Sequence, residues 1–320
     1  MKFVIAGGTG QVGTATARHF HALGHEVVVL SRTPRQAPWR TVPWDARSVG
    51  GWASELEGAD VVLNLAGRSV NCRYGNRNRD EILRSRVESV RAVAAAIAAA
   101  RRPPPLWLQM GTATIYAHRF DASNDEAHGL LGGGEVGAPD TWRFSHSVAE
   151  RWEKAALESS TPGTRQVILR TAMVMTPDRG GVFDALLRLV RWGLGGPVDG
   201  GRQYVSWIHE ADFLAALEFL MAHPEIEGPV NLAAPEPLPY RDFMGSLRNA
   251  WGRSVGLPAT RWMLEIGAFF LRTESELVLK GRRVVPGRLL EAGFQFRFPE
   301  WPGAAADLCR RVRDRRTAAP

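Results

Sequence analysis

The chain has 320 residues, of which 45% are hydrophobic and 23% are charged. These proportions are ordinary for a globular protein and exclude a wholly disordered chain. The formal net charge is +7, but residues 310–320 hold five arginines and one aspartate and so supply +4 of it. The remaining charge is too small to indicate a nucleic-acid-binding surface, and the basic stretches lack interleaved aromatic residues that stack on bases. We expect no nucleic-acid partner, and a disordered basic tail over residues 310–320.

The chain contains two cysteines, Cys72 and Cys309, which lack metal-ligand spacing. This pattern argues against a disulfide framework, predicts no metal site and is typical of a reducing compartment. No apolar run reaches the roughly 18 residues of a membrane span. The short apolar segment at residues 3–6 runs directly into two glycines, unlike a signal peptide. We therefore expect a cytoplasmic protein without a membrane partner, and the sequence carries no signal for its oligomeric state.

Strand-like and helix-like segments alternate along the first half of the chain. Apolar runs predict strands at residues 2–6, 27–30, 60–65, 106–110 and 166–170. Apolar residues at helical spacing predict helices at residues 12–23, 83–97 and 144–157. Near-continuous apolar strands alternating with helices indicate an α/β fold with a doubly wound, mostly parallel sheet, which is a Rossmann fold.

The alternation changes after about residue 176, where loops rich in glycine and proline become frequent. This change predicts a dinucleotide-binding domain over residues 1–178, to which residues 206–234 return as a last part of the main sheet. A smaller C-terminal substrate or cap domain is expected over residues 179–205 and 235–309. The stretch 117–143, which is rich in glycine and aspartate, predicts a mobile lid.

A glycine-rich turn follows the first predicted strand and opens the first predicted helix. Its sequence, Gly-Gly-Thr-Gly-Gln-Val-Gly, satisfies both the G-x-x-G-x-x-G and the G-x-G-x-x-G spacing. Glycine lets the backbone approach a pyrophosphate closely, and the amide groups and dipole at the helix start stabilise its negative charge. The turn predicts a dinucleotide site, with a ligand-free structural turn as the alternative. The predicted cofactor contacts are Gly7, Thr9, Gly10, Gln11, Val12 and Gly13.

The end of the second predicted strand indicates which dinucleotide binds. Enzymes that use NAD usually carry Asp or Glu there to bind the ribose 2′-hydroxyl. This chain has Ser31 and Arg32 instead, and no acidic residue at positions 30–33. A hydroxyl and a guanidinium suit a 2′-phosphate, which arginine binds through two N–H groups. These residues predict NADP(H) as the cofactor; the alternative is a surface arginine in an arginine-rich chain.

Further motifs extend over nearly the whole chain. They are Trp44-Asp45, Asn64-Leu65-Ala66-Gly67, Glu81-x-x-x-Ser85-Arg86, Trp152-Glu153, Trp207-Ile208-His209 with Asp212, and residues 231–235, 279–286 and 291–294. With these motifs the sequence resembles the atypical extended short-chain dehydrogenases/reductases. It is most similar to the group called epimerase family proteins, which carry a characteristic conserved C-terminal domain.

The resemblance implies further cofactor contacts at the carboxyl edge of the sheet. Leu65 and Ala66 would end the fourth strand beside the ribose on the nicotinamide side. Glu81 and Arg86 would lie on the long helix as a loose same-side pair that faces the cofactor. Val174 would sit against the nicotinamide. The structural alternatives are a strand end for the first two residues, a solvated ion pair for the next two and a core valine for the last.

The proton relay of ordinary short-chain dehydrogenases, Tyr-x-x-x-Lys on one helix, is absent from the sequence. In that relay the lysine lowers the pKa of the tyrosine, so that the phenol can act as a general acid or base. Phe144 and Val148 occupy the two matching positions, and neither side chain can move a proton. The relatives generally depart from the relay at the same place.

Three other residues near the predicted site carry polar groups. Thr112 matches the catalytic Ser/Thr position and predicts a hydroxyl that binds substrate, or else a strand-end hydroxyl bonded to the backbone. Tyr116 is a candidate catalytic acid, with a packed aromatic residue as the alternative. His209 is expected to cap or hold the helix that follows it.

Three functions fit these observations. The leading prediction is an NADP(H)-dependent oxidoreductase for a small carbonyl or alcohol substrate, which Thr112 orients while the proton comes from solvent or a nonstandard donor. A nucleotide-sugar epimerase is the alternative among enzymes, although the required alkoxide is harder to form without the tyrosine and lysine. A noncatalytic NADP(H)-binding regulator is the alternative outside enzymes, and the missing relay favours it.

Overall fold

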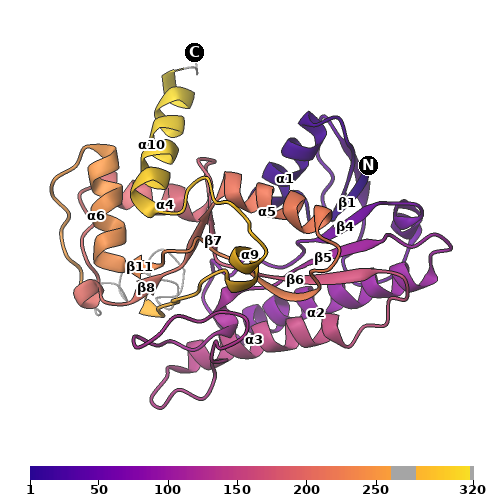
Figure 1. The fold of residues 1–320 in the computed structure, drawn as a ribbon, viewed down its shortest axis with the longest axis horizontal. Helices are drawn as coiled ribbons and strands as arrows, with labels where there is room; N and C mark the ends of the chain where they lie inside the picture. The colour runs from indigo at the N-terminus through magenta and orange to yellow at the C-terminus, as the bar shows by residue number, and fades with distance from the viewer. Residues whose placement is uncertain (261–278, 318–320) are drawn as a thin grey trace.

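A fully parallel seven-stranded sheet forms the centre of the computed structural model, which describes residues 1–260 and 279–317. Helices cover both of its faces (Figure 1). In spatial order the strands are β10 (Gly228–Leu232), β6 (Arg165–Thr171), β5 (Leu106–Met110), β4 (Val61–Asn64), β1 (Lys2–Ala6), β2 (Glu26–Ser31) and β3 (Arg40–Pro43). The predicted doubly wound α/β fold is confirmed, and β3 is a strand that the sequence patterns did not predict.

Two hydrophobic cores lie on the two faces of the sheet. The helices are α1 (Gln11–Ala22) and α5 (Glu210–Ala222) on one face, and α2 (Asn76–Ala99) and α3 (Asp140–Leu157) on the other (Figure 1). Along β1, Phe3 and Ile5 join the core under α1 and α5, whereas Val4 and Ala6 join the core under α2 and α3. Because successive side chains of a strand point to opposite faces, a strand buried on both must be apolar throughout, which explains the continuous apolar runs.

The order of the strands reverses at β1. The chain winds outward from β1 to β2 and β3 and then continues with β4 on the other side of β1. The carboxyl ends of β1 and β4 are therefore neighbours, and in open α/β sheets such a reversal forms the crevice where ligands bind. At the far edge β10 pairs with β6, from Gly228 opposite Val167 to Leu232 opposite Thr171, so the chain returns to the main sheet as expected.

A second group of helices packs beside the sheet and shares a third hydrophobic core. The helices are α4 (Val182–Arg191), α6 (Tyr240–Trp251) and α10 (Trp301–Thr317), and the short strands are β7 (Met173–Met175), β8 (Tyr204–Val205), β9 (Trp207–His209) and β11 (Leu238–Pro239). The remaining short helices are η1 (Gly51–Leu56), η2 (Ala113–Ile115), η3 (Asp199–Gly201) and α9 (Gly287–Glu291). Trp301 is central to this core: its ring stacks on Phe243 at 4.0 Å and meets Trp207 edge-on at 4.9 Å. None of the described helices is long and apolar enough to span a membrane.

The prediction of a disordered basic tail over residues 310–320 is wrong for residues 310–317, which continue α10. The helix buries Trp301, Ala304, Ala305 and Leu308 completely or nearly so. These positions recur at helical spacing, so one face of α10 packs against the core while the arginines project elsewhere. Burial of this face stabilises the helix despite its high charge.

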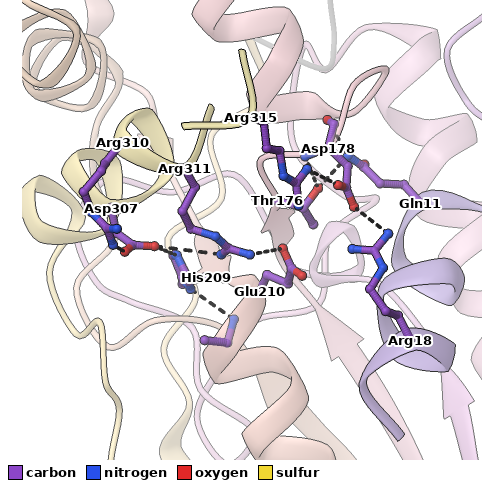
Figure 2. Close-up of polar contacts among 11 residues, drawn as sticks. Gln11, Arg18, Thr176, Asp178, His209, Glu210, Asp307, Arg310, Arg311 and Arg315 are labelled. Carbon is purple, nitrogen blue, oxygen red and sulfur yellow. Dashed lines mark hydrogen bonds and ion pairs between the residues drawn. The ribbon is translucent and has the colours of Figure 1, made fainter. Parts of the chain in front are cut away.

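Two arginines of α10 are paired with acidic residues from other elements (Figure 2). Arg315 donates to the carboxylate of Asp178, which also lies 3.7 Å from the guanidinium of Arg18 in α1. Arg311 lies 3.6 Å from the carboxylate of Glu210 at the start of α5. The C-terminal helix is thereby joined to the loop after β7 and to two helices of the main sheet.

The stretch predicted to be a mobile lid is held at its centre by the C-terminal segment. The amide of Asn124 donates to the carbonyl of Arg283 at 2.6 Å, and Val285 donates back to Asn124 at 2.9 Å. The carboxylate of Glu126 accepts from the amides of Asn231 at 2.7 Å and Arg288 at 3.3 Å. These bonds correct the expectation of a lid over residues 117–143, because its first half is part of the packed structure.

His209 caps α5, as predicted. Its Nδ1 accepts a hydrogen bond from the amide of Ala211 at 3.0 Å, so the neutral ring carries its proton on Nε2, which lies 3.3 Å from the carboxylate of Asp307 in α10 (Figure 2). The ring is buried, with Phe298 at 3.9 Å. Burial lowers the pKa of His209 to about 4, although Asp307 favours the protonated form. The folded protein therefore holds a neutral histidine here.

This burial predicts a loss of stability in mild acid. In the unfolded chain His209 takes up a proton near its ordinary pKa of about 6.5, so stability falls as the pH drops from there toward 4, by about 2 kcal/mol at pH 5. A His209→Asn variant keeps an N-cap acceptor without a titrating ring. Urea unfolding at pH 7 and pH 5 should show a smaller pH dependence for the variant. An equal pH dependence in both proteins would contradict this account.

Candidate functional site

The glycine-rich turn lies where β1 leads into α1, at the reversal of the strand order. Gly7 has a φ of +77°, and a Cβ there would lie 2.8 Å from the backbone of Ala66 at the end of β4. A Cβ on Gly13 would lie 2.5 Å from the Cα of Gly8. A Cβ on Gly10 would meet only the carbonyl of Gly7, at 3.8 Å. A Cβ on Gly8 would lie 2.9 Å from the side chain of Val29. Packing therefore demands three of the four glycines, whereas Gly10 borders open space.

The start of α1 is uncapped. No side chain accepts a hydrogen bond from its first-turn amides, and the first turn contains no acidic residue. An open glycine beside the free amides of a helix N-terminus fits the pyrophosphate of a dinucleotide, because the backbone can approach closely and donate several hydrogen bonds. The residues present thus fit the predicted cofactor at this end of the site.

Gln11 and Val12, two of the predicted contacts, use their side chains within the protein. Gln11 Nε2 donates to Thr176 Oγ1 at 2.7 Å and to the carbonyl of Asp178 at 3.2 Å (Figure 2). Val12 is half-buried against the core under α1. Gln11 therefore fixes the loop after β7 to the phosphate turn and offers only its backbone to a pyrophosphate. Asp178 is a residue that sequence reasoning missed, since no local pattern marks its pairing with α1 and α10.

Ser31 and Arg32 lie at the carboxyl end of β2, next to the glycine turn. The hydroxyl of the buried Ser31 is 3.2 Å from the hydroxyl of Thr9 and accepts from the amide of Thr33 at 3.2 Å. Arg32 is exposed and forms no ion pair with any residue in the described ranges. A fixed hydroxyl and an unpaired guanidinium thus stand beside the turn, with no acidic residue at positions 30–33.

The end of β4 is held against the glycine turn by hydrogen bonds. Leu65 donates to the carbonyl of Ala6 at 2.8 Å, and the amide of Ala66 donates to the side chain of Asn64 at 3.1 Å. The buried Asn64 in turn donates to the side chain of Gln109 in β5 at 2.9 Å. The ends of β1, β4 and β5 are therefore fixed relative to one another, with Leu65 and Ala66 directly beside the turn.

Glu81 and Arg86 do not form the predicted pair. Glu81 pairs with Arg68, from the loop before α2. Arg86 donates to the carbonyls of Arg68 at 3.0 Å and Ile82 at 2.9 Å, and its guanidinium lies over the ring of Trp152 at 5.0 Å. Burial lowers the pKa of Arg86 to about 10. Within the described residues no carboxylate contacts this guanidinium, so it is a partly buried cation without a counter-ion.

Thr112 and Val174 lie at the ends of β5 and β7. The hydroxyl of Thr112 caps η2 by accepting from the amide of Thr114 at 3.2 Å, and it also bonds the Thr114 hydroxyl at 3.1 Å. Thr114 in turn accepts from Arg282 Nε at 3.0 Å. This is the structural alternative foreseen for Thr112, and its substrate-binding role stays a prediction. Val174 is half-buried against the main core.

The candidate catalytic role of Tyr116 is corrected by its surroundings. Its side chain is 1% exposed. The hydroxyl donates to Asn231 Oδ1 at 3.0 Å and accepts from Arg170 Nη1 at 2.7 Å. Burial raises the pKa of Tyr116, although Arg170 opposes the shift. A buried phenol with both hydrogen-bonding functions occupied is a structural tyrosine, which is the alternative foreseen for it.

A cavity of about 530 Å³ lies between residues 118–142 and residues 199–203. Its wall includes the aromatic rings of His118, Phe120 and Trp142 and the polar side chains of Arg202 and Gln203. The amide of Gly281 donates to His118 Nδ1 at 2.8 Å, so the neutral ring carries its proton on Nε2. None of the predicted cofactor residues lines this cavity. No cluster of potential metal ligands occurs among the described residues.

The glycine turn yields a test with a matched pair of variants. Gly10→Ala adds a methyl group where there is space, so folding should be retained while the affinity for NADPH falls by about 10-fold or more, because the pyrophosphate loses its close approach. Gly13→Ala places the same methyl group 2.5 Å from Gly8 and should lower the melting temperature. Calorimetric titration and thermal unfolding separate the two effects. Equal effects of both variants on stability would contradict this division.

Comparison with known proteins assigns the chain to a family. A family model described as the NAD-dependent epimerase/dehydratase family matches residues 3–233, and a domain of unknown function, DUF1731, matches residues 259–308. The human epimerase family protein SDR39U1 is 32% identical over 313 residues, which are 96% of this chain and 99% of the relative. The epimerase family protein YfhF of Bacillus subtilis is 27% identical over 319 residues, 99% of this chain and all of the relative.

Solved structures agree with this assignment. The crystal structure of human SDR39U1 with NADPH matches with a TM-score of 0.84 at 30% identity, and covers 97% of this chain and 99% of that one. A nucleoside-diphosphate sugar epimerase from Corynebacterium glutamicum matches with a TM-score of 0.74 at 25% identity, over 97% of this chain and 58% of that one. The chain therefore belongs to the NAD-dependent epimerase/dehydratase family, among the epimerase family proteins with a DUF1731 domain.

Proposed function

We propose that the protein is an NADP(H)-dependent oxidoreductase that interconverts a small carbonyl compound and its alcohol. The observation that carries the cofactor choice is the end of β2, where Ser31 and the unpaired Arg32 stand beside the glycine turn. A guanidinium there binds a 2′-phosphate and has no role toward the 2′-hydroxyl of NAD. The NADPH-bound structure of the human relative supports the same choice.

The described residues have separable tasks in this proposal. The first turn of α1, with Gly10, binds the pyrophosphate, and Arg32 binds the 2′-phosphate. Leu65, Ala66 and Val174 line the path toward the end of β5. When bound, the nicotinamide supplies or accepts the hydride. Thr112 holds the substrate oxygen at the end of β5, and the cavity beside His118 takes the part of the substrate that does not react.

The cofactor choice has a direct test. Arg32→Ala should weaken NADPH binding by about 10- to 100-fold and leave NADH binding unchanged, because only the 2′-phosphate loses a charge-assisted contact. Arg91→Ala is the matched control, since Arg91 is an exposed arginine on α2 away from the turn. Both affinities can be measured through NAD(P)H fluorescence. An unchanged preference for NADPH in Arg32→Ala would refute the role of this residue.

Turnover is the second test. The protein should oxidise NADPH when it is mixed with one member of a panel of small aldehydes, ketones and quinones, or reduce NADP⁺ with an alcohol. Thr112→Ala should lower kcat by about 10- to 100-fold with little effect on NADPH affinity, because it removes the contact to the substrate oxygen. It also removes the cap of η2, so the melting temperature of the variant is measured beside its kcat. Turnover that is unaffected by Thr112→Ala would remove this residue from the reaction.

A noncatalytic NADP(H)-binding regulator is the second candidate. The replacement of the relay by Phe144 and Val148 and the internal hydrogen bonds of Thr112 favour it. Tight NADPH binding without turnover of any compound in the panel would decide for this function. Nucleotide-sugar epimerisation is a third candidate; the structural match to the sugar epimerase from Corynebacterium glutamicum supports it, and conversion of a nucleotide sugar without net NADPH consumption would identify it.

A further inference from the structure

The helix that carries the relay in ordinary short-chain dehydrogenases presents one continuous face in this protein. Phe144, Val148 and Trp152 recur every four residues along α3 and therefore lie on one side of it. Phe144 and Val148 belong to a small buried cluster that also contains Tyr74 and Ile82. The face of α3 on which Phe144 and Val148 replace the tyrosine and lysine of the relay is thus covered by residues from the start of α2 and the loop before it.

The phenol of Tyr74 and the guanidinium of Arg86 pack against this face of α3. The ring of Tyr74 packs edge-on against Phe144, with 5.2 Å between the ring centroids and 69° between the planes. The guanidinium of Arg86 lies 5.0 Å from the ring of Trp152, two helical turns beyond Phe144. A second guanidinium, that of Arg79, lies 4.9 Å from the Phe144 ring, but it is paired with Asp140 at 2.6 Å. Tyr74 and Arg86 therefore follow α3 in the same order as the tyrosine and lysine of the missing relay, but they belong to the neighbouring segment.

Tyr74 and Arg86 also interact electrostatically. Arg86 donates to the carbonyl of Ile82 at 2.9 Å, and Ile82 shares the buried cluster of Tyr74, so both groups lie at the start of α2. Burial lowers the pKa of Arg86, and negative charge on Tyr74 opposes that shift. Tyr74 is 8% exposed and stands immediately before Gly75, which caps the N-terminus of α2. Because α2 follows β4, this end of the helix lies at the carboxyl edge of the sheet, on the side of the cofactor turn.

The other three tyrosines are placed elsewhere. Tyr116 is buried with both functions of its hydroxyl occupied. Tyr204 lies in β8 with its ring 4.5 Å from the guanidinium of Arg283. Tyr240 is buried in the third core, and burial raises its pKa to about 12. Among the four tyrosines, Tyr74 is the one that packs against the helix of the lost relay.

We propose that Tyr74 is the proton donor of this site and that Arg86 is the positioning residue that stabilises its anion. The proposal rests on the proposed reduction of a carbonyl compound by NADPH. As hydride adds to the carbonyl carbon, the phenolic proton of Tyr74 passes to the carbonyl oxygen, and the π-electron pair of the carbonyl forms the new O–H bond. The products are the alcohol, the oxidised dinucleotide and the Tyr74 phenolate, which regains a proton from water.

Kinetics test the donor role. Tyr74→Phe removes one hydroxyl and should lower kcat by about 100-fold with a reducible probe such as para-nitrobenzaldehyde, diacetyl or menadione, while the Kd for NADPH is unchanged. Tyr204→Phe is the matched control and should retain wild-type kcat. Phe144→Tyr, added to Tyr74→Phe, returns a phenol to the same contact and should restore part of the loss. Phe144→Tyr in the wild-type background is the control, because a phenol at the relay position that raises kcat to the same extent there would act independently of Tyr74.

A spectroscopic titration tests the pair without any substrate. The difference in near-ultraviolet tyrosinate absorbance between the wild type and Tyr74→Phe isolates the titration of Tyr74, because the other three tyrosines cancel. The same difference measured in an Arg86→Gln background should have its midpoint about one pH unit higher, since the cation that stabilises the phenolate is gone. Arg86→Lys keeps the charge, and it should keep the midpoint close to that of the wild type.

The outcomes distinguish a failure of the roles of Tyr74 and Arg86 from a failure of the proposed oxidoreductase function. Wild-type kcat in Tyr74→Phe, with a probe that the protein reduces, overturns the donor role and leaves the oxidoreductase intact. An unchanged midpoint in folded Arg86→Gln overturns the role of Arg86. If Arg86→Gln does not fold, the neutral variant Arg86→Met replaces it, and an unchanged midpoint there has the same meaning. No reduction of any probe by the wild type overturns the proposed function together with the donor role.

Discussion

The contact between the glycine turn and the end of β4 is the constraint on which the rest of the site depends. Because the strand order reverses at β1, two chain segments leave the sheet side by side, and a Cβ on Gly7 would come within 2.8 Å of Ala66. Asn64 extends this contact to Gln109 and thus to β5, whose end carries Thr112. The glycine turn and the start of η2 after β5 are therefore held relative to each other by one line of contacts across three strands.

The arginine-rich C-terminal helix is connected to the glycine turn through Asp178. Arg315 pairs with Asp178, whose carbonyl accepts from Gln11 in the phosphate turn, and Arg18 of α1 pairs with the same carboxylate (Figure 2). Arg311 and Arg315 of the basic C-terminal helix thus have acidic partners elsewhere in the fold. Because these pairs are partly exposed, each contributes little by itself, and their effect lies in holding the loop after β7 against α1.

The sequence could predict what depends on local periodicity and local chemistry. The apolar runs predicted most of the strands of the main sheet, and the glycine spacing predicted the turn. The apolar residues of α10 are also periodic, but the high charge of its end led to the wrong prediction of disorder. Glu81 and Arg86 are five residues apart, which places them on different sides of a helix. Glu81 instead pairs with Arg77, one turn earlier on α2, and with Arg68 from a loop. The burial of Tyr116 depends on partners in β6 and β10, more than fifty residues away along the chain, and no local pattern contains that information.

The two pairs of tyrosine and arginine at this sheet edge differ in one physical respect. Arg170, beside Tyr116, donates to both carboxylate oxygens of Glu153 at 2.9 and 2.7 Å. Burial alone would lower the pKa of Arg170, but Glu153 raises it, and the carboxylate neutralises the charge that Tyr116 meets. Within the part of the chain that the structure describes, Arg86 has carbonyls and an aromatic ring as partners and no carboxylate, and burial lowers its pKa. An uncompensated cation stabilises a nearby phenolate more strongly than a compensated one, so Arg86 is a better partner for a phenolate than Arg170.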